Sequence, residues 1–131
     1  MSDYILEARK VVKRFGGLEA LKGVDIKVKR GKITGLIGPN GSGKTTFINC
    51  VSGFYKPTSG RIFFEERDIT GLKAHKVNRM GIARTFQVPR PFPRLTVLQN
   101  VMVATKDRKL ADDCIELVGL RGKRDTPARD L

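Results

Sequence analysis

The sequence contains no tryptophan, one histidine and two cysteines among its 131 residues. Cys50 and Cys114 cannot build a disulfide framework and show no metal-ligand spacing, so we interpret both as small core residues in a reducing compartment. The histidine, His75, stands among Lys73 and Lys76, and we expect it to be solvated. These shortages argue against a disulfide-stabilised scaffold and against a cysteine–histidine metal centre.

Long apolar runs are also missing. No run approaches the roughly 18 to 20 residues that a membrane-spanning helix needs. The first residues, Met1-Ser2-Asp3-Tyr4, lack the features of a signal peptide. We therefore expect a cytoplasmic chain, and its length corresponds to about one domain.

Acidic residues are scarce, since 13 Asp and Glu stand against 26 Lys and Arg and give a net charge of +13. Such an excess often marks a partner that is nucleic acid or an anionic membrane surface. However, Lys27 and Lys29 alternate with Ile26 and Val28, as on the solvated face of a half-buried strand. We therefore expect no nucleic-acid partner. The alternative, a basic nucleic-acid binder, predicts tight and salt-dependent binding to DNA.

One stretch carries a chemical signature. Residues 38–46 read Gly-Pro-Asn-Gly-Ser-Gly-Lys-Thr-Thr and fit the phosphate-binding loop G-x-x-x-x-G-K-[ST] from Gly38 to Thr45. The apolar run 32–37 predicts a buried strand before this loop, and residues 47–51 predict a helix after it. A glycine-rich turn that merely precedes a helix is the alternative, but it does not require these features in this order.

The residue types of the loop suit a nucleotide triphosphate. Glycines allow backbone N–H groups to point at phosphates, and the N-terminus of a helix attracts an anion. We assign Lys44 to the β and γ phosphates as a catalytic residue, the Thr45 hydroxyl to Mg²⁺, and Thr46 to the α phosphate. The predicted ATP-binding residues of the loop are Gly38, Asn40, Gly41, Ser42, Gly43, Lys44, Thr45 and Thr46.

Short elements are predicted on both sides of this loop. Strands are expected over 4–12, 24–28, 61–64 and 81–86. Helices are expected over 72–80 and from Thr96 to about Ala104. A last helix is expected to have one apolar face, made of Leu110, Cys114, Leu117 and Val118. A turn is expected at 65–68, and three prolines make 88–94 an irregular loop. Phe15, in a turn beside two glycines, is either a core aromatic or an exposed ring on which a base stacks.

A phosphate-binding loop alone fits several classes of nucleotide-binding protein. Asp68-Ile69-Thr70-Gly71 matches the D-x-x-G of GTPases, but it follows a charged turn where an apolar strand is required. The sequence contains no Asn-Lys-x-Asp guanine-recognition motif. A GTPase is therefore disfavoured.

The chain resembles the ATP-binding subunits of ABC transporters, in particular those of branched-chain amino acid importers, with urea importers as near neighbours. The matching segments are Arg14–Leu18 with Ala20-Leu21, Gly35–Thr46, Gly53-Phe54, Pro57, Asp68–Gly71, Gly81–Gln87, Leu95–Leu98 and Asn100-Val101. The loop is generic, whereas Arg-Thr-Phe-Gln followed by Leu-Thr-Val-Leu is specific to this branch. The resemblance implies an α/β P-loop NTPase with an N-terminal antiparallel β subdomain.

The resemblance also implies roles and partners. It makes Phe15 the adenine-stacking aromatic and Gln87 a catalytic glutamine whose amide reaches Mg²⁺ or the attacking water. It implies transmembrane permease subunits as partners beside the 88–94 loop, a second ATP-binding subunit that completes a dimer, and a peripheral location on the cytoplasmic face of the membrane.

The resemblance ends at Leu131, where the family's Leu-Ser-Gly-Gly-Gln signature would begin. The strand ending in Asp, the adjacent Glu and the switch histidine have no counterpart in residues 1–131, so we expect these residues to form the N-terminal part of one ABC ATP-binding domain with an incomplete parallel sheet. Two hypotheses follow: a subunit of an importer ATPase, or a nucleotide-binding module without efficient turnover. Acidic residues in the family's second half would also explain the net charge.

Overall fold

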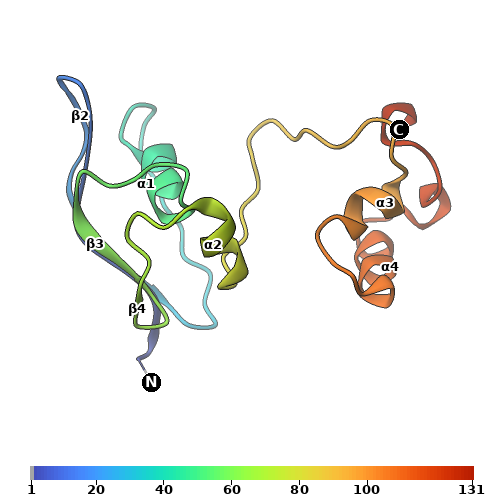
Figure 1. Cartoon of the computed structure of the whole chain (residues 1–131), viewed down its shortest axis with the longest axis horizontal. Helices are drawn as coiled ribbons and strands as arrows, with labels where there is room; N and C mark the ends of the chain where they lie inside the picture. The colour runs from blue at the N-terminus through green and yellow to red at the C-terminus, as the bar shows by residue number, and fades with distance from the viewer. Residues whose placement is uncertain (1) are drawn as a thin grey trace. The chain divides into compact units, whose positions relative to one another are not determined.

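A long β-hairpin is the main element of the first part of the molecule (Figure 1). The computed structural model describes residues 2–131, which divide into one unit ending at Arg84 and a second running from Thr85 to Leu131. Strands β1 (Tyr4–Phe15) and β2 (Leu18–Lys29) pair antiparallel, with Phe15 opposite Leu18. Gly16 connects them with a φ of 57°, a left-handed conformation that glycine adopts without a steric penalty. The strands predicted over 4–12 and 24–28 are confirmed, and each continues up to the turn that joins them.

A second hairpin completes the sheet. Strands β3 (Ser59–Phe64) and β4 (Arg67–Asp68) flank Glu65 and Glu66, whose positive φ angles of 48° and 66° suit a two-residue hairpin turn. The strand order is β2-β1-β3-β4, and every pairing is antiparallel. The predicted antiparallel β subdomain is confirmed.

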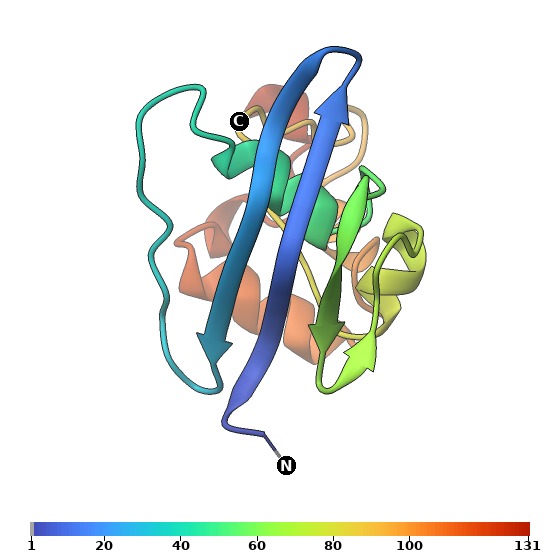
Figure 2. The same ribbon diagram turned by 90° about the vertical axis from the view of Figure 1, so that its left-hand side faces the viewer.

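The core of the first unit lies between this sheet and helix α1 (Lys44–Val51). Figure 2 shows α1 behind the hairpin. Alternation along the strands directs one set of apolar side chains toward the helix. The buried residues of this core are Ala8, Val11, Leu21, Phe47, Cys50, Val51, Ile62, Phe64 and Ile69. Helix α2 (Ala74–Arg79) follows the second hairpin and buries Val77, while His75 is exposed as expected.

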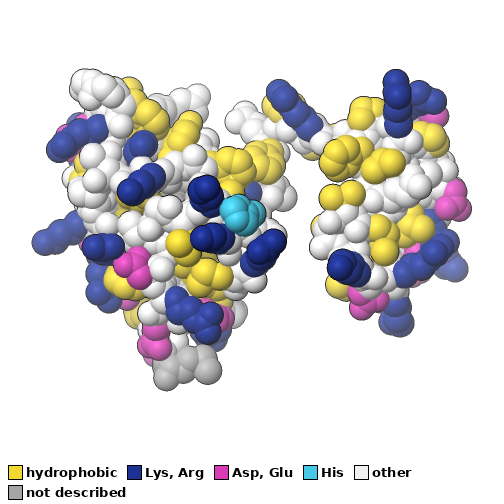
Figure 3. Space-filling view, viewed as in Figure 1, with side chains coloured by type: hydrophobic (Ala, Val, Ile, Leu, Met, Phe, Trp, Pro, Cys, Tyr) yellow, Lys and Arg dark blue, Asp and Glu magenta, His cyan; other side chains and the backbone are white. Residues whose placement is uncertain are grey.

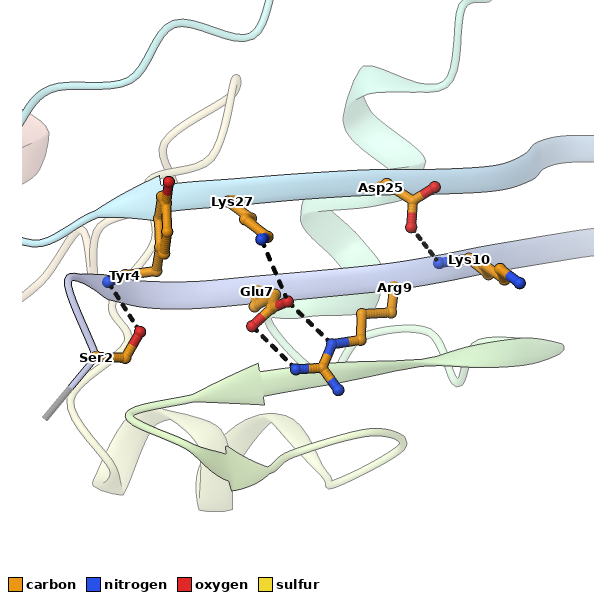
Figure 4. A network of polar contacts seen from close by, with 7 residues as sticks. All are labelled: Ser2, Tyr4, Glu7, Arg9, Lys10, Asp25 and Lys27. Carbon is orange, nitrogen blue, oxygen red and sulfur yellow. Dashed lines mark hydrogen bonds and ion pairs between the residues drawn. The ribbon is translucent and has the colours of Figure 1, made fainter.

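The opposite face of the sheet is polar (Figure 4). The guanidinium of Arg9 donates two hydrogen bonds to Glu7, and the ammonium of Lys27 lies 3.9 Å from the same carboxylate. These partners, with the Arg9 hydrogen bonds first, lower the pKa of Glu7 from its ordinary value. Lys27 therefore lies on the solvated face of a strand, as its alternation with apolar neighbours predicts. Figure 3 shows basic side chains on the visible face of each unit.

Two predicted strands do not form. Residues 32–37 and 81–86 pair with no other strand in the part of the chain that the structure describes. Ile33 and Ile37 are 103% and 95% exposed, so the run predicted to be buried is open to solvent. A strand needs a neighbour to satisfy its backbone groups, and the four antiparallel strands supply none for these segments.

The second unit is helical. It contains α3 (Val97–Met102), α4 (Arg108–Leu117), and the short 3₁₀ turns η1 (Arg121–Lys123) and η2 (Ala128–Asp130). Thr96 caps α3 by accepting a hydrogen bond from the Gln99 amide at 3.1 Å, and the Gln99 side chain accepts one from the Thr96 amide at 2.9 Å. The predicted capping box is therefore confirmed. The 88–94 loop lacks regular structure, also as predicted.

The prediction of which face of the last helix is buried is wrong. Ala111 and Ile115 are buried against α3, whereas the predicted face is exposed. That face comprises Leu110, Cys114, Leu117 and Val118. Successive helical residues are about 100° apart, so the neighbouring stripe of Ala111 and Ile115 meets α3 instead. Cys114 is thus not a core residue, whereas Cys50 is buried as predicted.

No helix within residues 2–131 is both long and apolar enough to span a membrane.

Candidate functional site

The predicted phosphate-binding loop leads directly into α1, which begins at Lys44. Gly43 precedes the helix with a φ of 97°, and no side chain caps the helix N-terminus. The first turn also contains no acidic residue. The leading N–H groups of α1 and the positive end of its dipole are therefore suited to an anion.

The ammonium of Lys44 lies within this loop. It donates hydrogen bonds to the carbonyl oxygens of Gly38 and Pro39, the latter at 2.8 Å, and lies 3.3 Å from the Ser42 hydroxyl. The structure thus brings the predicted residues Gly38, Ser42 and Lys44 together. These contacts hold a full positive charge beside the N-terminus of α1, where phosphate oxygens can replace the carbonyls as partners.

Glycines are required in this loop by close packing. A Cβ atom on Gly43 would lie 2.7 Å from the Ala20 carbonyl oxygen and 2.8 Å from Leu21 Cδ2. A Cβ on Gly38 would lie 2.7 Å from Ser42 Oγ. Gly41 has open space around it but a φ of 83°, which side chains rarely allow. The loop therefore packs directly against β2 and has its path fixed by glycine.

The two threonines lie in the first turn of α1, with Thr45 exposed and Thr46 half-buried. Asn40 is exposed in the loop. Residues 2–131 include no group of three His, Cys, Asp or Glu side chains that could hold a metal. Mg²⁺ prefers few protein oxygens together with phosphate and water, so an accessible hydroxyl beside a phosphate-binding loop fits this ion.

Phe15 is partly packed and partly accessible. Its ring meets Tyr55 edge-on, with centroids 5.2 Å apart and planes at 75°. The Lys13 ammonium lies 5.0 Å from the Phe15 centroid and donates a hydrogen bond to the Lys56 carbonyl at 3.0 Å. The ring remains 41% exposed, so the packing and stacking interpretations are compatible.

Sequence reasoning missed Lys13 and Tyr55 as neighbours of Phe15. The sequence could have indicated Lys13 as a neighbour of Phe15, because residues two positions apart on a strand lie on the same face. No local pattern indicated Tyr55, since it lies after α1 and approaches Phe15 only through the tertiary fold.

Gln87 is exposed and belongs to the second unit, so its predicted role beside Mg²⁺ stays a prediction.

The family model described as ABC transporter matches residues 21–131. The chain belongs to the ABC transporter family. Its α/β fold class is also that of solved family members. A nucleotide-free ATP-binding cassette from an ABC transporter is 36% identical with a TM-score of 0.83, over 98% of this chain and 59% of that one. The ADP conformation of another cassette is 34% identical with a TM-score of 0.82, over 99% and 59%.

Curated relatives within the ABC transporter family point to one branch. A probable branched-chain amino acid transport ATP-binding protein, LivG of Archaeoglobus fulgidus, is 54% identical over 76% of this chain and 39% of its own length. The high-affinity branched-chain amino acid transport ATP-binding protein BraF of Pseudomonas aeruginosa is 48% identical over 79% and 41%. The chain therefore spans about two fifths of the length of these relatives. The resemblance to this branch is confirmed.

Proposed function

We propose that this chain provides the nucleotide-binding part of an ATP-binding subunit that couples ATP binding and hydrolysis to the uptake of branched-chain amino acids. The observation that carries the proposal is the glycine-lined loop at the uncapped N-terminus of α1, with the Lys44 ammonium inside it. The solute is suggested by the names of the relatives. Residues 1–131 then form the N-terminal part of one ABC ATP-binding domain.

The loop residues bind and orient the triphosphate in this proposal. The backbone N–H groups of the loop and of the first turn of α1 donate to phosphate oxygens, and Lys44 neutralises charge on the β and γ phosphates. Thr45 offers its hydroxyl to Mg²⁺, Thr46 contacts the α phosphate, and the exposed part of Phe15 stacks on adenine. When bound, Mg²⁺ would neutralise charge on the β and γ phosphates.

The same proposal assigns partners. Gln87 contributes an uncharged amide oxygen toward the metal or the attacking water, and the adjoining 88–94 loop faces transmembrane permease subunits. A second ATP-binding subunit completes the dimer. The chain then acts as a peripheral protein on the cytoplasmic side of the membrane.

Replacing Lys44 with alanine tests the proposal. Removing the ammonium takes away hydrogen bonds to charged phosphate oxygens, each of which contributes about 1.5 to 3 kcal/mol. We expect the affinity for Mg-ATP in isothermal titration calorimetry to fall at least about 10-fold. Lys32→Ala, which removes an exposed ammonium outside the loop, is the matched control and should leave the affinity unchanged. Equal affinities for wild type and Lys44→Ala would refute the proposed function.

A further inference from the structure

The ring of Phe15, at the turn of the first hairpin, is held by two side chains that belong to none of the motifs in the sequence. The Lys13 ammonium lies over this ring, 5.0 Å from its centroid, and the Tyr55 ring meets it edge-on with centroids 5.2 Å apart. The same ammonium lies 5.7 Å from the Tyr55 centroid. One cation thus contacts both rings, and the three side chains restrain one another.

Both neighbours of the Phe15 ring are anchored to the first unit. The Lys13 ammonium donates a hydrogen bond to the Lys56 carbonyl at 3.0 Å. The Tyr55 amide donates to the Asn49 carbonyl of α1 at 3.1 Å. The Thr58 amide donates to a carbonyl of β1 at 2.8 Å, and its hydroxyl accepts from an amide of β1 at 2.9 Å. The segment 55–58 is therefore attached to both β1 and α1, which holds Tyr55 beside the hairpin turn.

The Phe15 ring lies within reach of a nucleotide bound in the phosphate-binding loop. Phe15 pairs with Leu18, and a Cβ atom on Gly43 of the loop would lie 2.7 Å from the Ala20 carbonyl oxygen. Two residues along a strand span about 7 Å, a separation that a ribose can bridge. Figure 2 shows the hairpin turn and the loop before α1 at the same end of the sheet. Phosphates at the start of α1 therefore leave the base near Phe15.

The two neighbours leave part of the Phe15 ring open to a ligand. The side chain is 41% exposed although it contacts Lys13 and Tyr55. The ammonium lies over one face, so a flat ligand stacks on the surface that remains. A cation over one face draws the π electrons of the ring toward itself, which weakens their repulsion of the π electrons of a base on the other side.

We infer that Lys13 and Tyr55 are positioning residues that orient and polarise the Phe15 ring, and that they thereby set the part of the ATP affinity that depends on the base. The inference rests on the proposed function, in which Phe15 stacks on adenine. Lys13 acts through its charge, and Tyr55 acts through its ring.

Isothermal titration calorimetry of the 131-residue chain with Mg-ATP and with Mg-tripolyphosphate, which lacks the nucleoside, tests this inference. The ratio of the two dissociation constants measures the preference for the nucleotide. Stacking of one base on an aromatic ring should make this preference at least about 5-fold in the wild type. Phe15→Ala should remove most of it. A salt concentration of about 0.15 M screens the long-range attraction of a distant ammonium for the phosphates.

Two variants remove the neighbours of the Phe15 ring one at a time. Lys13→Met keeps the aliphatic stem without the ammonium, and Tyr55→Leu removes the ring. Each should lower the preference for Mg-ATP about 2- to 5-fold and leave the affinity for Mg-tripolyphosphate unchanged. Tyr55→Phe keeps the ring and should retain the wild-type preference. Lys29→Met removes an exposed ammonium opposite Tyr4, at the other end of the hairpin, and is the matched control.

The outcomes separate the inference from the proposed function. A wild-type preference in Lys13→Met or in Tyr55→Leu overturns the inference, as does an equal loss of affinity for both ligands, which indicates a purely structural role. Lys13→Met decides alone if circular dichroism shows Tyr55→Leu to be unfolded. A wild type that binds both ligands equally overturns the inference while the phosphate site stands. A wild type that binds neither ligand overturns the proposed function as well.

Discussion

At the scale of single residues, the loop depends on glycine for two separate reasons. Gly41 needs the freedom of its positive φ, whereas Gly43 also needs the absence of a side chain. The difference lies in the neighbours: open space surrounds Gly41, and the Ala20 carbonyl and Leu21 approach Gly43. The loop therefore packs closely against β2 because Gly43 carries no Cβ atom.

Gly43→Ala should damage both folding and binding. The added Cβ would meet backbone at 2.7 Å in a conformation with a φ of 97°, so the loop must shift. We expect a loss of about 1 to 3 kcal/mol in the free energy of unfolding, measured by urea denaturation and circular dichroism. Affinity for Mg-ATP should fall as well. Gly35→Ala, at an open position without a positive φ, is the control, and similar losses for both variants would contradict the packing explanation.

At the scale of elements, the ends of α3 and of the second hairpin are stabilised by side chains. In α3 the capping box satisfies one amide at each of Thr96 and Gln99. Asn100 extends this order into the proline-rich loop, since its side chain exchanges hydrogen bonds with both the amide and the carbonyl of Phe92. The irregular segment before α3 is thus attached to the helix that follows it.

Thr96→Ala should destabilise the second unit. Loss of the cap leaves the Gln99 amide without its acceptor, which costs about 1 kcal/mol for a typical N-cap. Faster amide exchange in residues 96–102 would report the effect. Thr34→Ala, at an exposed threonine of the 32–37 segment, is the control and should not change amide exchange in residues 96–102. Unaltered exchange in Thr96→Ala would show that the cap contributes no stability.

Asp68 gives the second hairpin a pH dependence. Its carboxylate accepts a hydrogen bond from the Thr70 amide at 2.9 Å and pairs with Arg61 at 3.2 Å. Hydrogen bonds from Thr70, followed by the Arg61 charge, lower the pKa of Asp68. Because the folded pKa lies below the unfolded value, the stabilisation is present above the unfolded value of about 3.9 and is lost as the pH falls through the folded one.

We therefore expect Asp68→Asn to be less stable than the wild type at about pH 7 and about pH 5 by the same amount, and by less at about pH 3. Urea denaturation followed by circular dichroism measures the difference. A gap that widens toward acidic pH would show that the carboxyl group is not stabilised in its charged form.

At the scale of the whole molecule, the chain contains the predicted phosphate-binding loop and also apolar segments that pair with no strand within residues 2–131. Ile33, Ile37 and Phe86 are all more than half exposed. Apolar runs at this level of exposure favour association between molecules. The first turn of α1 also has no carboxylate that could serve as a general base for an attacking water.

The 131-residue chain should accordingly bind ATP with little turnover. A triphosphate held without a positioned water and base is bound but not hydrolysed at the rate of an intact transport ATPase. A coupled phosphate-release assay measures turnover, and size-exclusion chromatography measures association. Turnover at the rate of an intact enzyme, or a compact monomer with strongly protected amides in 32–37, would contradict this expectation.

Local chemistry was sufficient to predict much of this protein. The glycine-rich path of the loop over 38–43, the helix after it, the hairpin turn at Gly16 and the capping box at Thr96 each follow from residue types a few positions apart. The tertiary structure alone decided the features that depend on distant neighbours. Residues 32–37 have the composition of a buried strand but pair with no strand within residues 2–131. The last helix buries Ala111 and Ile115 in place of the stripe beside them, and Tyr55 reaches Phe15 only through folding. The physical reason is that turns and caps are satisfied within one stretch of chain, whereas a strand edge or a helix face is buried only if another element covers it.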